Sequence, residues 1–192
     1  LGATAQPKLY PCAHVIQPYI DAALTLRESG LNSAAVTSIE CIMAPWAMPI
    51  VGEPRPTKIA PRNDLEAIAS LPFMVAAALI DGRVDLATLR PETINRHDIR
   101  ALASRIDCKA EASLGVGFDG RMNVVCSDGR SLSHAIGLVP ATEQRVIAKF
   151  HANTASQPHV ARDTLLRALL DEAPQGRELM RLATAALSVN PA

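Results

Sequence analysis

A cation and a phenol lie close together near the start of the chain, just before a predicted helix. Lys8 and Tyr10 are followed by Pro11, which ends an extended segment, and by Pro18, whose fixed φ suits a first helical turn. The sequence therefore predicts that Lys8 and Tyr10 lie on a loop at a helix N-terminus. An ammonium group, a phenolic hydroxyl and the free N–H groups of a first turn together suit an anion. Carboxylates are the expected ligands.

The helix that should position these groups is predicted over residues 17–29, with Gly30 placed to end it. Asp21 falls in its first turn, where the helix dipole favours an anion, so it is interpreted as a helix-start residue and not as a catalytic one. Cys12 could act as a nucleophile, because a nearby lysine and a helix start both lower the pKa of a thiol. No partner base is fixed by the sequence, and a small buried thiol is the favoured interpretation.

The other potential metal or redox ligands show no organised spacing. Cys12, Cys41, Cys108 and Cys126 are far apart in the sequence, and no Cys-x-x-Cys pair is present. Reduced, buried thiols of a cytoplasmic protein are expected, although the four could pair in a secreted protein. The five scattered histidines give no metal template, so no metal site is expected.

Four segments have the alternation and β-branched content of strands, and several others have helical periodicity. The strands are predicted at 34–43, 108–114, 121–127 and 130–138, and the helices at 64–81, 91–105, 142–153, 160–172 and 176–189. Asp128-Gly129 predicts a two-residue type I′ hairpin turn. These elements indicate an α+β fold: a two-layer sandwich of a roughly four-stranded, mainly antiparallel sheet with helices on one face, followed by C-terminal helices.

Residues 44–63 contain five prolines and the only tryptophan, Trp46, so they are predicted to lack regular structure. One interpretation is a loop that covers a substrate, with a cationic lining from Lys58 and Arg62. The alternative, slightly favoured, is a solvated connector. A second loop, Gly-Val-Gly-Phe-Asp-Gly from Gly115, fits the dinucleotide pattern G-x-G-x-x-G, but a strand and not a helix follows it. We interpret these glycines as a turn between strands and exclude a nucleotide site.

Composition excludes several classes of partner. The chain of 192 residues has 48% hydrophobic and 20% charged residues, as expected of a globular domain. Its 19 basic and 19 acidic residues cancel, which argues against nucleic acid. The longest apolar run, 73–80, is too short to span a membrane, and residues 1–5 do not resemble a signal peptide.

Three motifs together carry a resemblance to a known family. They are Lys-x-Tyr-Pro-Cys from Lys8, Ile-Asp-Ala-Ala from Ile20, and Ser-Leu-Pro-Phe-Met-Val-Ala-Ala-Ala-Leu-Ile-Asp-Gly from Ser70. They resemble the MmgE/PrpD family, which contains 2-methylcitrate dehydratases, cis-aconitate decarboxylases and iminodisuccinate epimerases. The resemblance implies a lid domain at 1–140 and closing helices at 141–192. Those helices would pack on an N-terminal helical domain that is missing from this chain. Members of the family are commonly homodimers.

The resemblance also implies a chemistry and a set of site residues. Family enzymes use no metal or organic cofactor and move a proton on a carbon next to a carboxylate. Lys8 would lie in the active-site cleft and stabilise the developing charge, while Tyr10, Gln17, Ser70 and Phe73 would bind the substrate. Without the motif around it, Lys8 would be interpreted as a surface lysine.

Two positions depart from the family pattern. Many relatives have histidine where this chain has Gln17, and tyrosine where it has Phe73. Gln17 cannot take a proton and Phe73 has no hydroxyl to donate one. Either this protein uses a different acid–base set, or the two positions only shape the pocket, or the protein is a degenerate relative. His14 lies one helical turn before Gln17 and is a candidate replacement for the imidazole.

Two hypotheses about function follow. The first is the C-terminal part of a cofactor-independent lyase or isomerase that acts on a small di- or tricarboxylate and is inactive as this fragment. The second is a non-catalytic dimerisation or ligand-binding domain derived from the family.

Overall fold

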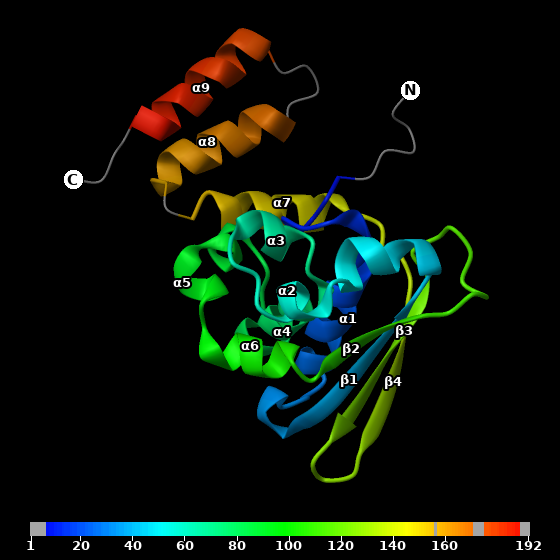
Figure 1. Ribbon diagram of the computed structural model, residues 1–192. Coiled ribbons are helices and arrows are strands. Elements are labelled where there is room, and N and C mark those ends of the chain that lie inside the picture. Colours follow the sequence, from blue (N-terminus) through cyan, green and yellow to red (C-terminus); the bar gives the residue numbers. More distant parts are fainter. Residues whose placement is uncertain (1–6, 156, 171–174, 189–192) are drawn as a thin grey trace. The chain divides into compact units, whose positions relative to one another are not determined.

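A four-stranded sheet forms one layer of the N-terminal part of the chain (Figure 1). Its strands are β1 (Val36–Met43), β2 (Ile106–Ala110), β3 (Gly120–Cys126) and β4 (Ser131–Ile136), in the order β2-β1-β3-β4. β1 runs parallel to β2, and the β1–β3 and β3–β4 pairs are antiparallel. The predicted α+β fold with a mainly antiparallel sheet is confirmed. This computed structural model describes residues 7–155, 157–170 and 175–188.

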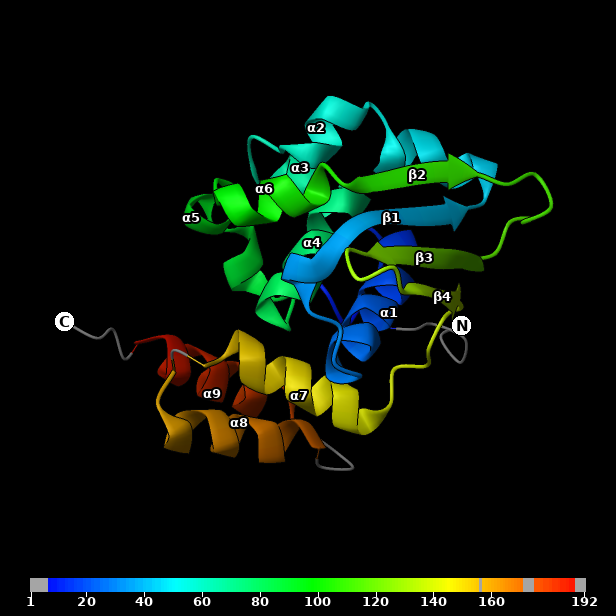
Figure 2. The same cartoon turned by 90° about the horizontal axis from the view of Figure 1, so that it is seen from below.

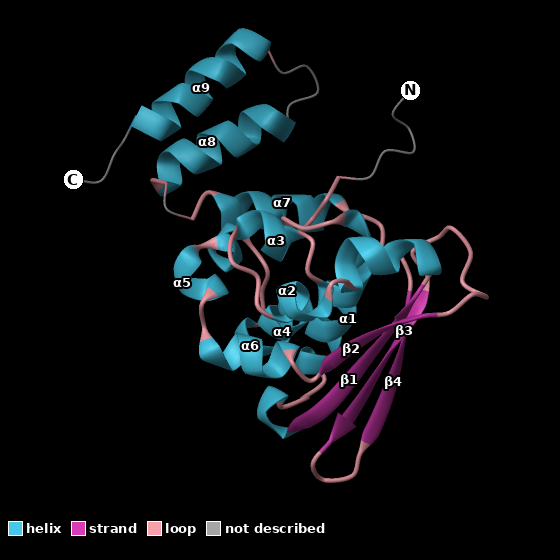
Figure 3. Cartoon of the chain, in the orientation of Figure 1, coloured by secondary structure: helices cyan, strands magenta, loops and turns pink. Residues whose placement is uncertain are grey.

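Helices cover one face of the sheet. Met122, Val124 and Cys126 of β3 are buried on that face, whereas Arg121 before them and Val125 between them are exposed. The alternation follows from the two-residue repeat of a strand. The main covering helices are α1 (Gln17–Glu28) and α4 (Leu71–Asp81), which also contact each other. Figure 2 and Figure 3 show the strands grouped beside these helices.

α4 is the hydrophobic centre of this layer. All residues from Leu71 to Leu79 are buried, as expected for a helix that is apolar all round. The predicted helix 64–81 is wrong in one respect, because it is two helices: α3 (Asp64–Ile68) and α4. Ser70 between them has extended dihedrals and caps α4, so the chain turns sharply there.

The other predicted helix of this region is also divided. Residues 91–105 form α5 (Pro91–Ile94) and α6 (His97–Ala103), separated by Arg96 in an extended conformation. Short 3₁₀ turns complete this region: η1 (His14–Ile16), η2 (Ser33–Ala35) and η5 (Leu86–Leu89).

The prediction that residues 44–63 lack regular structure is wrong. They form η3 (Pro45–Ala47), the π-helical turn η4 (Met48–Gly52) and α2 (Arg55–Ile59). Each of these elements has a proline in its first turn, where no intrahelical N–H is required. The proposed cationic lining is also wrong for Lys58, which is 7% exposed and donates to the carbonyl groups of Ile50 and Ala69, both at 2.7 Å. Burial lowers the pKa of Lys58.

The hairpin between β3 and β4 has a three-residue loop and not the predicted type I′ turn. Gly129 has φ +84°, but among the described residues no non-glycine residue has positive φ, so Asp128 does not meet the requirement of type I′. The Gly129 N–H donates to the Cys126 carbonyl at 3.0 Å and the Cys126 N–H to the Arg130 carbonyl at 2.9 Å. This is the pattern of a type I turn followed by a glycine bulge.

The chain divides into two compact units, 1–140 and 141–192. The second contains α7 (Glu143–Asn153), α8 (His159–Leu170) and α9 (Gly176–Ser188), close to the predicted ranges. The predicted helix ends at 172 and 189, and the segment 1–5, lie outside the described residues. Within the described ranges, every helix is too short or too polar to cross a membrane.

One side chain fastens α1 to the sheet. The Tyr19 hydroxyl donates a 2.7 Å hydrogen bond to the Ile42 carbonyl near the end of β1, and Tyr19 is 1% exposed. Gly120, the first residue of β3, lies against both groups. A Cβ atom at Gly120 would overlap the Ile42 carbonyl oxygen and the Tyr19 hydroxyl. Glycine is therefore required here for close approach.

We predict that Gly120→Ala lowers the free energy of unfolding by about 1–3 kcal/mol, because backbone and a buried phenol must move to admit the methyl group. Urea denaturation would measure the loss. Gly115→Ala is the control, since a Cβ there meets nothing within 4 Å. Equal midpoints for the two variants would contradict the close packing of Gly120.

Candidate functional site

Residues 8–13, which we call the strap, are held against the helices by three hydrogen bonds. The Leu9 N–H donates to Gln17 Oε1 at 2.8 Å, and the Tyr10 hydroxyl donates to Asp21 Oδ1 at 2.6 Å. The Ala13 N–H donates to the Ile68 carbonyl at the end of α3, at 2.9 Å. Lys8 is exposed. The first two bonds hold Leu9 and Tyr10, the two residues directly after Lys8, so the lysine lies on an ordered segment.

Gln17 is the buried member of this arrangement. It is 5% exposed, and its Oε1 is used by the strap, whereas Nε2 has no hydrogen-bond partner among the described residues. A buried amide N–H group without a partner costs free energy, which a ligand oxygen at that position would recover. A neutral imidazole also has one acceptor nitrogen and one N–H donor, but it cannot present the two with the geometry of an amide.

The expected anion site at the first N–H groups of α1 is not formed by Ile16 and Gln17. η1 precedes α1 directly, and the Ile16 N–H donates to Ala13 while the Gln17 N–H donates to His14. The 3₁₀ turn extends the helix backwards and uses these donors. Lys8 of the strap, and not the helix terminus, remains as the candidate anion ligand, because the Tyr10 O–H is already donated to Asp21.

His14 is half-buried at the start of η1 and is stacked on Phe118. Sequence analysis did not single out Phe118, which belongs to the loop between β2 and β3 that carries the G-x-G-x-x-G pattern. That loop leads into β3 and not into a helix, so its interpretation as a turn between strands is confirmed. No sequence pattern links His14 to Phe118, because the sheet brings them together.

Ser70 and Phe73 lie behind the strap and expose no surface. The Ser70 hydroxyl donates to the Lys58 carbonyl and accepts from the Phe73 N–H at 3.1 Å, so it serves as the cap of α4. Phe73 packs in the core. Direct contact of these two residues with a substrate stays a prediction.

Cys12 does not have the environment of a nucleophile. It is 2% exposed, and burial raises the pKa of its thiol to about 12, with the nearby Lys8 only partly opposing this. The other three cysteines are also free thiols, of which Cys41 and Cys126 are buried. Cys12 is therefore a packing residue, as the favoured interpretation proposed.

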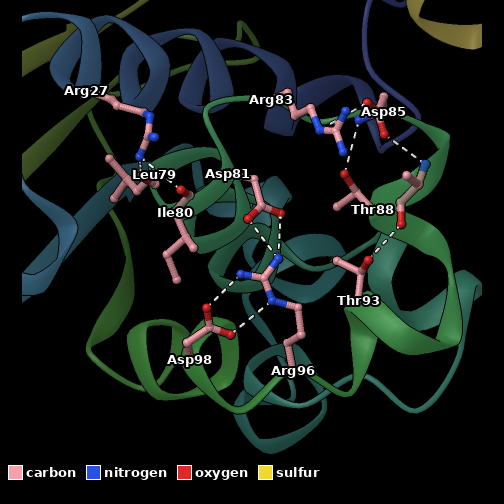
Figure 4. Close-up of polar contacts among 11 residues, drawn as sticks. Arg27, Leu79, Ile80, Asp81, Arg83, Asp85, Thr88, Thr93, Arg96 and Asp98 are labelled. Atoms are coloured by element: carbon pink, nitrogen blue, oxygen red, sulfur yellow. Dashed lines mark hydrogen bonds and ion pairs between the residues drawn. The ribbon is translucent and has the colours of Figure 1, made fainter. Parts of the chain in front are cut away.

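A hollow of about 430 Å³ lies at the C-terminal end of α4 (Figure 4). Arg96 donates to both oxygens of Asp81, at 2.8 and 3.0 Å, and also pairs with Asp98 at 2.6 Å. These pairs raise the pKa of Arg96 and lower that of Asp98. These pairs join α4 to α6. Because two carboxylates neutralise the Arg96 guanidinium, the network has no excess positive charge that could bind an anion.

Metal ligation finds no support in this part of the chain. Across residues 7–155, 157–170 and 175–188, no group of three His, Cys, Asp or Glu side chains is arranged to hold an ion.

Comparison with known families gives one match. The model of the MmgE/PrpD C-terminal domain matches residues 10–172, a range that begins two residues after Lys8 and includes most of the strap. A search of curated proteins finds no significant match.

We predict that Gln17→Met increases hydrogen exchange at the Leu9 amide, because the variant fills the buried space but removes the acceptor. The rate would be measured by NMR. Gln17→Glu keeps an acceptor oxygen and should retain more protection than Gln17→Met. Equal rates in the wild type and Gln17→Met would contradict the proposed clamp.

We predict slow alkylation of Cys12 in the folded chain. A pKa of about 12 instead of 9.0 lowers the thiolate fraction at pH 8 about a thousandfold. Iodoacetamide labelling, followed by peptide mass spectrometry, would compare native protein with protein in urea. Similar labelling rates in the two states would show that the thiol is accessible and ionised.

Proposed function

The chain belongs to the MmgE/PrpD family, and we propose that it is the C-terminal part of a cofactor-independent lyase or isomerase acting on a small di- or tricarboxylate. The observation that carries this proposal is the strap: an exposed lysine on a segment tied by side-chain hydrogen bonds to α1, within a chain that matches the family's C-terminal domain. The reaction that we propose resembles that of a 2-methylcitrate dehydratase.

The proposed chemistry is proton transfer on a carbon next to a carboxylate. Removal of that proton moves negative charge onto the carboxylate, and the ammonium group of Lys8 would stabilise it. His14 would exchange the proton, since imidazole is suited to acid–base work near neutral pH. Gln17, through its buried Nε2, would donate to a substrate oxygen, and Tyr10, whose O–H is donated to Asp21, would accept from a substrate hydroxyl group.

The proposal places the remaining catalytic groups on the N-terminal helical domain typical of the family. Helices α7 to α9 would pack on that domain, and the enzyme would be a cytoplasmic homodimer. The 192-residue chain alone is then expected to lack turnover.

A second candidate function is a non-catalytic domain that binds a ligand or mediates dimerisation. It is favoured by Gln17 and Phe73, which cannot transfer protons and which are both buried. A binding domain would retain affinity for polycarboxylates without catalysing their conversion.

We predict that the product of the natural gene, including any segment encoded upstream, converts 2-methylcitrate, cis-aconitate or iminodisuccinate. Lys8→Gln should lower kcat/KM about 100-fold or more, the usual effect of removing one preorganised charge-stabilising group. Coupled or direct spectrophotometric assays would measure the rates. Arg130→Gln is the control, because this exposed residue pairs locally with Asp128 in the β3–β4 hairpin.

Two outcomes would contradict the assignments. No turnover of any of the three substrates, with binding retained, would favour the second candidate. Turnover that Lys8→Gln and Arg130→Gln leave equally unaffected would remove Lys8 from the mechanism.

A further inference from the structure

We propose that Phe118, supported by Trp46, is a positioning residue that orients the imidazole of His14. The loop between β2 and β3 then forms part of the same site as the strap. This inference rests on the proposed function, because it assigns a role to Phe118 through the action of His14 on a substrate.

The three rings make two contacts from three separate segments. The centroids of His14 and Phe118 are 5.1 Å apart with an interplanar angle of 20°, which is a stacked pair. Trp46 of η3 meets Phe118 edge-on, with centroids 6.0 Å apart and an angle of 62°. Both geometries are favourable for aromatic rings.

The fold explains why these rings meet. Tyr19 binds the Ile42 carbonyl, and Gly120 lies against that hydrogen bond. Each ring is close in sequence to one of these three residues. Trp46 comes four residues after Ile42, and Phe118 comes two residues before Gly120. His14 comes five residues before Tyr19. The contact between α1 and the sheet thus brings the start of the helix beside the end of β1 and the start of β3.

Stacking suits a histidine that must exchange protons. In the described part of the chain, no hydrogen bond to the His14 imidazole is found, so Phe118 is the side chain that restrains its plane. An apolar ring can restrain an imidazole without occupying either nitrogen. Both nitrogens therefore stay available to a substrate, whereas a carboxylate partner would have used one of them.

Phe118 is itself restrained on its second side. It is partly buried against the hydrophobic core, and Trp46, 37% exposed, makes the T-shaped contact with it. The preceding loop residues, Gly115, Val116 and Gly117, are exposed and provide no such anchor. Phe118 thereby links the glycine-rich loop to the site.

The test follows the His14 ring by NMR in the 192-residue chain. Because a ring stacked on Phe118 experiences its ring current, the His14 Cε1–H signal should lie upfield of that of a free histidine. Phe118→Leu should return it to the free position, and Phe118→Tyr should preserve the shift. His14→Gln assigns the signal.

The chain offers a matched control. Phe150 and His151 form a second aromatic–imidazole pair, with centroids 5.9 Å apart, in the other compact unit. Phe150→Leu should change the His151 signal and leave that of His14 in place.

Tricarballylate, which has three carboxylates and no hydroxyl group to lose, serves as the unreactive ligand. It should perturb the His14 signal and the fluorescence of Trp46, the only tryptophan, in the wild type and in Phe118→Tyr. Phe118→Leu should bind it but show a smaller His14 response. In the gene product that turns over substrate, Phe118→Leu should lower kcat about tenfold or more with little change in KM, and Phe118→Tyr should restore it.

The outcomes separate the two proposals. A His14 signal and ligand response unchanged in Phe118→Leu would overturn the positioning role while the carboxylate site stands. In the natural gene product, tricarballylate without effect on any signal of residues 7–140 would contradict the proposed function. The stack would then be a structural contact only, which also overturns the positioning role.

Discussion

The arrangement of this protein's N-terminal unit depends on the hydrogen bond from the Tyr19 hydroxyl to the Ile42 carbonyl. The bond is buried, so breaking it would leave a carbonyl group or a phenol without a partner in a place that water does not reach. It sets the depth of α1 against the sheet, and it requires a glycine at position 120. Every residue assigned to the candidate site lies on the first half of α1, on the strap before it, or on a segment that meets it there.

The strap shows how a short segment can present a charge from an ordered position. Gln17, Asp21 and the Ile68 carbonyl hold it at three points, which lowers the entropy that Lys8 must lose on binding an anion. Gln17 clamps the strap through Oε1, and its Nε2 has no partner among the described residues. In our proposal His14 performs the acid–base work.

Much of the fold could be predicted from local patterns, while the site could not. β3 was visible in its alternation and the end of α1 in Gly30, which has φ +92°. The helical turns around the prolines of 44–63 were missed, because prolines in first turns look like helix breakers when their position in the element is unknown. The break at Ser70 was hidden within an otherwise continuous apolar pattern. The position of Phe118 beside His14 depends on the register of β1 with β3, which the sequence alone does not specify. The roles of Lys8, Tyr10, His14, Gln17, Ser70 and Phe73 stay predictions.

The most direct test of the account is a crystal structure of the natural gene product with bound tricarballylate. We expect one carboxylate within hydrogen-bond distance of Lys8 Nζ, with a second ligand oxygen accepting from Gln17 Nε2 and the His14 ring still stacked on Phe118. Tricarballylate bound away from the strap, with Lys8 Nζ remote from every carboxylate, would contradict the assignment of the site.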